Sequence, residues 1–243
     1  MTAAYEESDS APEAVLFDYS GTLFDDTSVL TPDRLAAQCA ARGRQLTLHQ
    51  AAELVTAVQL TVDSAEGRAR RAEADLSPAL HRGAWTELAR TAPGSDALIA
   101  DAFYACVTAV RAWRPYPDTG PVLTALRRAG TPVAVVSNTG WDIRGSFAAA
   151  GLAGLVSAFV LSCELGTQKP DPAIFLAACD RLGVAPGRAL MVGDDPDKDG
   201  AAAAVGLAVR ILPADRSLGR PRGLASALPL RASRSHRLRF RSR

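Results

Sequence analysis

The chain has 243 residues, 48% of them hydrophobic, and a formal net charge of +1. A chain of this length and composition can bury a substantial core, which excludes a disordered or fibrous protein. The first ten residues lack the basic and apolar regions of a secretory signal, no apolar run is long enough to cross a bilayer, and the four cysteines are widely scattered. We therefore expect a cytoplasmic protein with reduced thiols and no membrane span.

Charge is distributed unevenly along the chain. Residues 216–243 carry nine arginines and no acidic residue, and removing those nine from the 27 basic residues leaves 18 against 26 acidic ones. We expect a basic, disordered tail over 216–243 and a disordered N-terminus over 1–13. The folded part shows no basic face or recognition motif, so we expect no sequence-specific nucleic-acid binding.

The first expected strand covers residues 14–19, and the next expected strand begins only at residue 132. This interval is far too long for one crossover helix, and its apolar spacing is helical throughout. The expected helices in it cover residues 31–43, 48–64, 77–91 and 95–113. We therefore predict an all-α domain, residues 28–112, inserted into the chain.

After the insert, short apolar runs alternate with stretches of helical spacing. Strands are expected at 132–138, 158–162, 189–194 and 207–212, and helices at 121–130, 143–151, 171–183 and 199–206. This alternation is typical of a parallel sheet with helices on both faces. We predict an α/β fold whose Rossmann-like core consists of residues 14–27 and 113–215.

Polar residues follow four of the expected strands, at the edge of an open parallel sheet where ligands bind. They are Asp18, Ser20, Gly21 and Thr22 after the first strand, Ser137 and Asn138 after the second, Lys169 after the third, and Asp194, Asp195 and Asp199 after the fourth. Carboxylates about 4 Å apart repel by roughly 4 kcal/mol at an effective dielectric constant near 20. Asp18 and Asp194 therefore need a cation between them, and Mg²⁺ accepts such hard oxygen ligands.

Lysine is rare in this chain. Lys169 and Lys198 are the only two lysines among 27 basic residues. A compact ammonium on a flexible stem suits a phosphate oxygen where space is tight, which favours Lys169 as a catalytic cation. Lys198, flanked by Asp197 and Asp199, is interpreted as a solvated charge.

The motifs DYSGT, SN, KPDP and GDDPDKD, in this order, resemble those of the haloacid dehalogenase superfamily over nearly all of the chain except its two ends. The resemblance implies a hydrolase with an aspartate nucleophile that acts on a phosphate ester or anhydride. It also implies that the insert over 28–112 is a cap domain placed between the first two motifs.

The resemblance also implies a role for each matching residue. Asp18 would attack phosphorus and bind Mg²⁺, together with the backbone carbonyl of Ser20 and the carboxylate of Asp194, while Asp195 or Asp199 would hold metal-bound waters. Lys169 would bridge the nucleophile and the phosphoryl oxygens. Phosphate would bind at Ser137 and the backbone around Asn138. Apart from the resemblance, we expect Gly21 to permit a backbone turn and Thr22 to hydrogen-bond to Asp18 and orient it.

Ser20 departs from the family pattern. Most phosphatases of the superfamily carry an aspartate there as general acid and base, and a serine hydroxyl titrates far too high for this role near pH 7. Either the substrate therefore has a good leaving group, such as an acyl or aryl phosphate, or another group supplies the proton. We expect a phosphoric monoester hydrolase, monomeric or homodimeric, that acts on a small phosphorylated metabolite with a good leaving group.

Three alternatives compete with this interpretation: two relatives with other chemistry and one non-catalytic protein. Phosphonoacetaldehyde hydrolase needs a Schiff-base lysine from its cap. Residues 28–112 contain no lysine, so this chemistry is excluded. L-2-Haloacid dehalogenases use the same nucleophile without metal but lack the aspartate seen here as Asp194, so this alternative is disfavoured but open. A binding or regulatory protein that keeps the fold, with Ser20 marking decayed catalysis, is also open.

Overall fold

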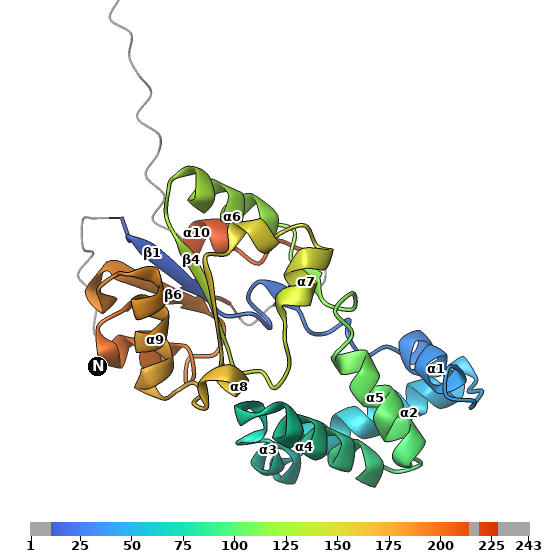
Figure 1. Ribbon diagram of the computed structural model, residues 1–243. Helices are drawn as coiled ribbons and strands as arrows, with labels where there is room; N and C mark the ends of the chain where they lie inside the picture. The colour runs from blue at the N-terminus through green and yellow to red at the C-terminus, as the bar shows by residue number, and fades with distance from the viewer. Residues whose placement is uncertain (1–10, 214–218, 228–243) are drawn as a thin grey trace, which may run out of the picture.

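The computed structural model describes residues 11–213 and 219–227 (Figure 1). Its centre is a parallel sheet with strand order β5-β4-β1-β6-β7. The strands are β1 (Ala14–Phe17), β4 (Val133–Ser137), β5 (Ala158–Leu161), β6 (Ala189–Gly193) and β7 (Ala208–Ile211). Every expected strand is present, although each is shorter than expected, and the expected α/β fold class is confirmed.

The two faces of the sheet bury separate clusters because side chains alternate along each strand. Val15 and Phe17 of β1 face a cluster with α6 (Thr119–Arg128), α7 (Arg144–Ala149) and α10 (Leu224–Ala227). Ala14 and Leu16 face the opposite cluster, which α9 (Pro172–Leu182) and the 3₁₀-helix η4 (Gly200–Val205) complete. Figure 1 shows α6 and α9 on opposite sides of the sheet.

The insert leaves and rejoins the sheet through a short antiparallel pair, β2 (Phe24–Asp25) and β3 (Arg114–Pro115), which is too short to leave a signal in the sequence. Its helices are α1 (Pro32–Ala40), α2 (Leu48–Asp63), α3 (Ala65–Arg70), η1 (Ala74–Leu76), α4 (Pro78–Thr91) and α5 (Ala97–Val107). Of these, α1, α2, α4 and α5 enclose an apolar cluster of their own, and Figure 1 shows the helices of the insert beside the sheet domain. The insert is helical throughout, as expected.

The insert contacts the sheet domain near the carboxyl ends of β4 and β5. Ser162 Oγ donates to the carbonyl of Asp75 at 2.6 Å, and Gln168 Nε2 donates to that of Ala72 at 2.5 Å. Gly140, just after β4, lies so close to His81 of α4 that a Cβ built on the glycine would be 2.0 Å from the histidine Cβ. Only a glycine therefore permits this approach.

The structure corrects two expectations. Residues 200–205 form 3₁₀-helix and not α-helix. Part of the tail expected to be disordered is folded, because residues 219–227 pack on the sheet domain and Leu224 is fully buried there. At the N-terminus Glu13 already pairs with Arg188, whereas residues 1–10, 214–218 and 228–243 lie outside the described part.

The remaining short elements are connections: η2 (Ala153–Leu155), α8 (Ser162–Leu165) and η3 (Pro186–Arg188). Among the described residues, no helix combines the length and the apolar character needed to cross a membrane.

Candidate active site

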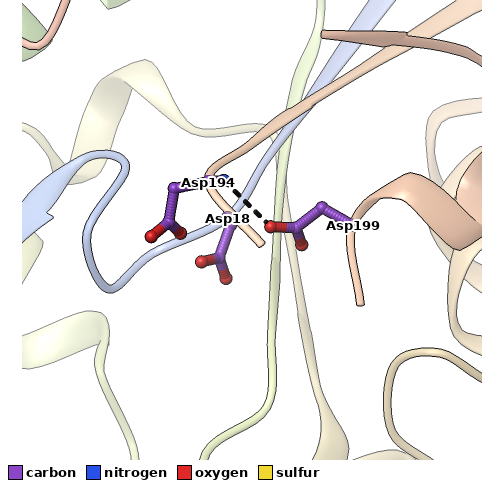
Figure 2. A group of neighbouring side chains, drawn as sticks. All are labelled: Asp18, Asp194 and Asp199. Carbon is purple, nitrogen blue, oxygen red and sulfur yellow. Dashed lines mark hydrogen bonds between the residues drawn. The ribbon is translucent and has the colours of Figure 1, made fainter. Parts of the chain in front are cut away.

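Three aspartates meet at the carboxyl ends of β1 and β6. One carboxylate oxygen from each of Asp18, Asp194 and Asp199 lies within 4.8 Å of the other two (Figure 2). Asp18 is 8% exposed and Asp199 is fully buried. Charged oxygens this close repel strongly in a buried site, so the cluster requires positive charge.

Lys169 supplies one positive charge. Its Nζ donates to Asp18 Oδ1 at 2.7 Å and to Asp199 Oδ1 at 2.6 Å, and the side chain is 3% exposed. Burial alone lowers the pKa of Lys169, but the two carboxylates raise it above its usual value, so the amine stays charged. One lysine against three carboxylates leaves a formal charge of −2, which a divalent cation balances.

Asp199 is held by the backbone at the end of β6. Its Oδ2 accepts the N–H groups of Asp194 at 3.0 Å and of Asp195 at 3.1 Å, and Figure 2 shows the first of these bonds. A Cβ built on Gly193 would lie 2.1 Å from Asp199 Oδ2. Because Gly193 has no side chain, the Asp199 carboxylate can pack directly against the backbone at the end of β6.

The side chain of Asp195 bonds to its own loop and not to the carboxylate cluster. Its Oδ1 accepts the backbone N–H groups of Asp197 and Lys198, each at 3.0 Å, and its Oδ2 pairs with Lys198 Nζ at 3.0 Å. These bonds shape the loop and hold the pKa of Asp195 below its usual value, although burial alone raises it. Between the two residues that the sequence left open, Asp199 lies in the carboxylate cluster, and Asp195 borders the same cavity.

Ser137 ends β4 and Asn138 follows it, and both border the same cavity as the aspartates. Asn138 Nδ2 donates to the carbonyl of Lys169 at 2.8 Å, and its Oδ1 accepts the Lys169 N–H at 2.8 Å. These two hydrogen bonds fix the backbone of the segment that carries Lys169. Ser137 is buried at the end of its strand.

The loop after β1 carries Ser20, Gly21 and Thr22. Gly21 has a φ of 72°, a left-handed conformation that suits glycine. Thr22 Oγ1 donates to Asp194 Oδ1 at 3.3 Å, so its hydrogen bond goes to Asp194 and not to Asp18 as expected. Ser20 Oγ donates to Asp26 Oδ2 at 3.1 Å, which brings to the cavity a carboxylate that the sequence analysis did not select.

A cavity of about 610 Å³ extends from these residues to the insert. Its wall includes the aromatic residues Tyr19, Trp85, Phe103, Trp113 and Trp141. The ring centroids of Tyr19 and Trp113 are 4.9 Å apart, and those of Trp113 and Trp141 are 5.8 Å apart. Aromatic side chains from both the sheet domain and the insert therefore form part of the cavity wall.

Polar residues of the insert also line the cavity. The guanidinium of Arg71 lies 4.6 Å from the ring centroid of Trp85, and His81 Nδ1 is 3.0 Å from the hydroxyl of Tyr104. Burial lowers the pKa of His81 to about 4, so the imidazole is neutral at pH 7. Helical periodicity predicts the helices of the insert but not which of its side chains line the cavity, so these residues are not predictable from the sequence pattern.

Comparisons with known proteins agree with this geometry. The family model of haloacid dehalogenase-like hydrolases matches residues 12–206. A phosphoserine phosphatase of Thermus thermophilus is 39% identical over 114 residues, which are 46% of this chain and 45% of that protein. The match thus spans less than half the length of that relative. A phosphoglycolate phosphatase of Xylella fastidiosa is 29% identical over 220 residues, or 81% of this chain and 78% of that protein.

A solved structure is similar over a greater length. An L-2-haloacid dehalogenase that is 26% identical superposes with a TM-score of 0.59 over 90% of this chain and 91% of its own. The shared arrangement therefore includes the insert as well as the sheet.

Proposed function

Because the chain belongs to the haloacid dehalogenase-like hydrolases, we propose that it is a magnesium-dependent phosphatase in which Asp18 is the nucleophile. The observation that carries this proposal is the group of three carboxylates, two of which pair with one buried lysine. All three aspartates line the cavity. Asp18 follows β1 and is next to the loop that carries Ser20.

The chemistry of the donor set fits Mg²⁺. Three carboxylates with one ammonium leave a formal charge of −2, and hard oxygen donors suit this ion. Asp18, Asp194 and the Ser20 carbonyl would hold the ion, with Asp199 and Asp195 as residues that support it. When bound, Mg²⁺ offsets charge on the phosphoryl oxygens.

The reaction proceeds in two displacements. A carboxylate oxygen of Asp18 attacks phosphorus, forming an O–P bond as the ester O–P bond breaks and the alcohol oxygen leaves with the electron pair. Water then attacks the same phosphorus, the O–P bond to Asp18 breaks, and phosphate and the free Asp18 carboxylate are released, while the proton that the water loses goes to the departed oxygen through bulk water. Lys169, bonded to Asp18 Oδ1, stabilises charge on the transferring oxygens, and Ser137 with the backbone at Asn138 binds them.

The insert acts as a cap that selects the substrate. Its residues Trp85 and Phe103 line the same cavity as the catalytic groups, and Trp113 and Trp141 line it too. Such a wall favours a phosphate ester with an aromatic or otherwise bulky apolar body. An aryl phosphate also has a good leaving group, which suits an enzyme with Ser20 at the general-acid position.

Dehalogenation is the second candidate, because the chain also resembles an L-2-haloacid dehalogenase. In that reaction Asp18 would attack carbon and displace halide. The acidic group of Asp194 and Asp199 beside the nucleophile supports the phosphatase, since a metal-free dehalogenase has no use for the added negative charge.

The test is turnover of an aryl phosphate by the wild-type chain with Mg²⁺ and with EDTA, beside release of halide from 2-chloropropionate. We expect phosphate release that requires Mg²⁺ and is absent in Asp18→Asn. Halide release without metal would establish the dehalogenase instead, and a folded protein that turns over neither compound would favour a binding or regulatory protein.

A further inference from the structure

The C-terminal segment of residues 219–227 lies beyond the part matched by the family model, which ends at residue 206. Asp118 anchors this segment at the start of α6. Its carboxylate accepts the backbone N–H groups of Arg222 and Gly223 at 2.8 Å each and of Leu224 at 2.9 Å. The side chain of Leu224 is buried in the cluster between the sheet and α6.

This anchorage brings one arginine to the active-site loop. Arg222 is 4% exposed, and its Nε donates to the carbonyl of Gly21 at 2.5 Å. Its Nη1 donates to the carbonyl of Pro213 at 2.5 Å, and the guanidinium lies 5.9 Å from the ring centroid of Tyr116. Two backbone carbonyls and an aromatic ring therefore fix the position of the guanidinium.

The carbonyl that Arg222 binds belongs to the turn between Asp18 and Thr22. The same glycine donates its N–H to the carbonyl of Phe24 at 2.8 Å. Glycine permits many backbone conformations, so a turn built on it is held by its hydrogen bonds and not by its own sterics. The peptide group that carries the Gly21 carbonyl continues into Thr22, whose hydroxyl donates to Asp194.

We propose that Arg222 is a positioning residue for the loop that carries Asp18 and Ser20, so that the C-terminal segment forms part of the catalytic apparatus. This inference rests on the proposed function for its effect on turnover. Without Arg222 the buried Gly21 carbonyl loses a charged donor, and the turn that sets Ser20 and Thr22 relaxes. Misplacement of reacting groups by about 1 Å lowers rates by on the order of 100-fold.

The experiment compares the full-length variants Arg222→Met and Arg222→Lys with the matched control Arg128→Met, which removes an exposed arginine from α6. Two properties are measured: kcat and KM for an aryl phosphate with Mg²⁺, and backbone amide hydrogen exchange over residues 19–24. For Arg222→Met we expect kcat to fall roughly 10- to 100-fold with KM within about twofold, and exchange to accelerate at the turn. Arg222→Lys should keep part of the activity, and Arg128→Met should match the wild type.

Each outcome decides the inference. A lower melting temperature with unchanged kcat and unchanged exchange at residues 19–24 would make Arg222 a structural anchor only and overturn the proposal. If Arg222→Met does not fold, Arg222→Lys decides, since wild-type kcat in that variant would equally overturn it. If the wild type itself turns over no phosphate ester, the proposed function fails, and the exchange comparison still tests whether Arg222 holds the loop.

Discussion

Replacing Asp18 by asparagine should abolish hydrolysis and yet stabilise the metal-free protein at pH 8. Burial, together with the charges of Asp199 and Asp194, raises the pKa of Asp18 to about 7 even though Lys169 acts in the opposite direction. A carboxyl whose pKa is higher in the folded than in the unfolded chain favours folding only while it is protonated. Its ionised form therefore destabilises the folded protein when no cation is bound.

The size of this effect follows from the shift. The pKa of Asp18 rises from 3.8 to about 7, and each pKa unit corresponds to about 1.4 kcal/mol, so the ionised form costs roughly 4 kcal/mol. This stability is present below the unfolded pKa, is lost as pH rises through the folded pKa, and stays lost above it. Asparagine resembles the protonated acid, so Asp18→Asn should recover most of this lost folding free energy at pH 8.

The assay is urea unfolding of wild type, Asp18→Asn and the control Asp180→Asn, which changes an exposed acid of α9. Each is measured in EDTA and in Mg²⁺ from pH 4 to pH 8. We expect the free energy of unfolding of the wild type to fall between pH 4 and pH 7 in EDTA and to recover when Mg²⁺ is added. The fall with pH and the gain from Mg²⁺ should both be smaller in Asp18→Asn, whereas Asp180→Asn should behave like the wild type. A variant less stable than wild type at pH 8 in EDTA would refute this reasoning.

Three further predictions concern the catalytic groups and the cavity. Lys169→Met should lower kcat for an aryl phosphate by about 100-fold or more, since a charge next to the transferring oxygens is lost; near-normal turnover would show that the lysine is only structural. Ser20→Asp should raise kcat/KM for alkyl phosphates more than for nitrophenyl phosphate, and equal slopes across a leaving-group series would mean that another group, such as Asp26, carries the proton. Trp85→Ala should raise KM for an aryl phosphate by about two- to tenfold, as expected for the loss of an aromatic contact worth roughly 0.5–1.5 kcal/mol, while leaving acetyl phosphate unaffected; an equal change for both would place the ring outside the substrate site.

The sheet and most of the candidate site follow from sequence because each polar motif ends an apolar run. Parallel strands bring their carboxyl ends to one edge, and β1 pairs directly with β6, so Asp18 and Asp194 lie near each other. Spacing alone did not separate Asp195 from Asp199, since both lie on the loop after β6. The choice depends on Gly193, which has no side chain in the space that the Asp199 carboxylate fills.

Residues that act across long sequence separations were not predictable in the same way. Arg222 is one of nine arginines in a stretch whose composition indicates disorder, and its anchor Asp118 lies 104 residues earlier. Similarly, Arg71 follows α3 and Trp85 lies on α4, and the helical periodicity of the insert shows its buried side but not the side that meets the sheet domain. Both cases depend on tertiary contacts that leave no local pattern.

The role of Asp18 as nucleophile is tested most directly by trapping the covalent intermediate. The wild-type chain is mixed with excess acetyl phosphate and Mg²⁺, quenched in acid within the first turnover, and its peptides are analysed by mass spectrometry. We predict one phosphoryl group on Asp18, lost on incubation with Mg²⁺ at neutral pH and absent from Asp18→Asn. Turnover with Asp18 unmodified, or with the phosphoryl group on another residue, would contradict the assignment.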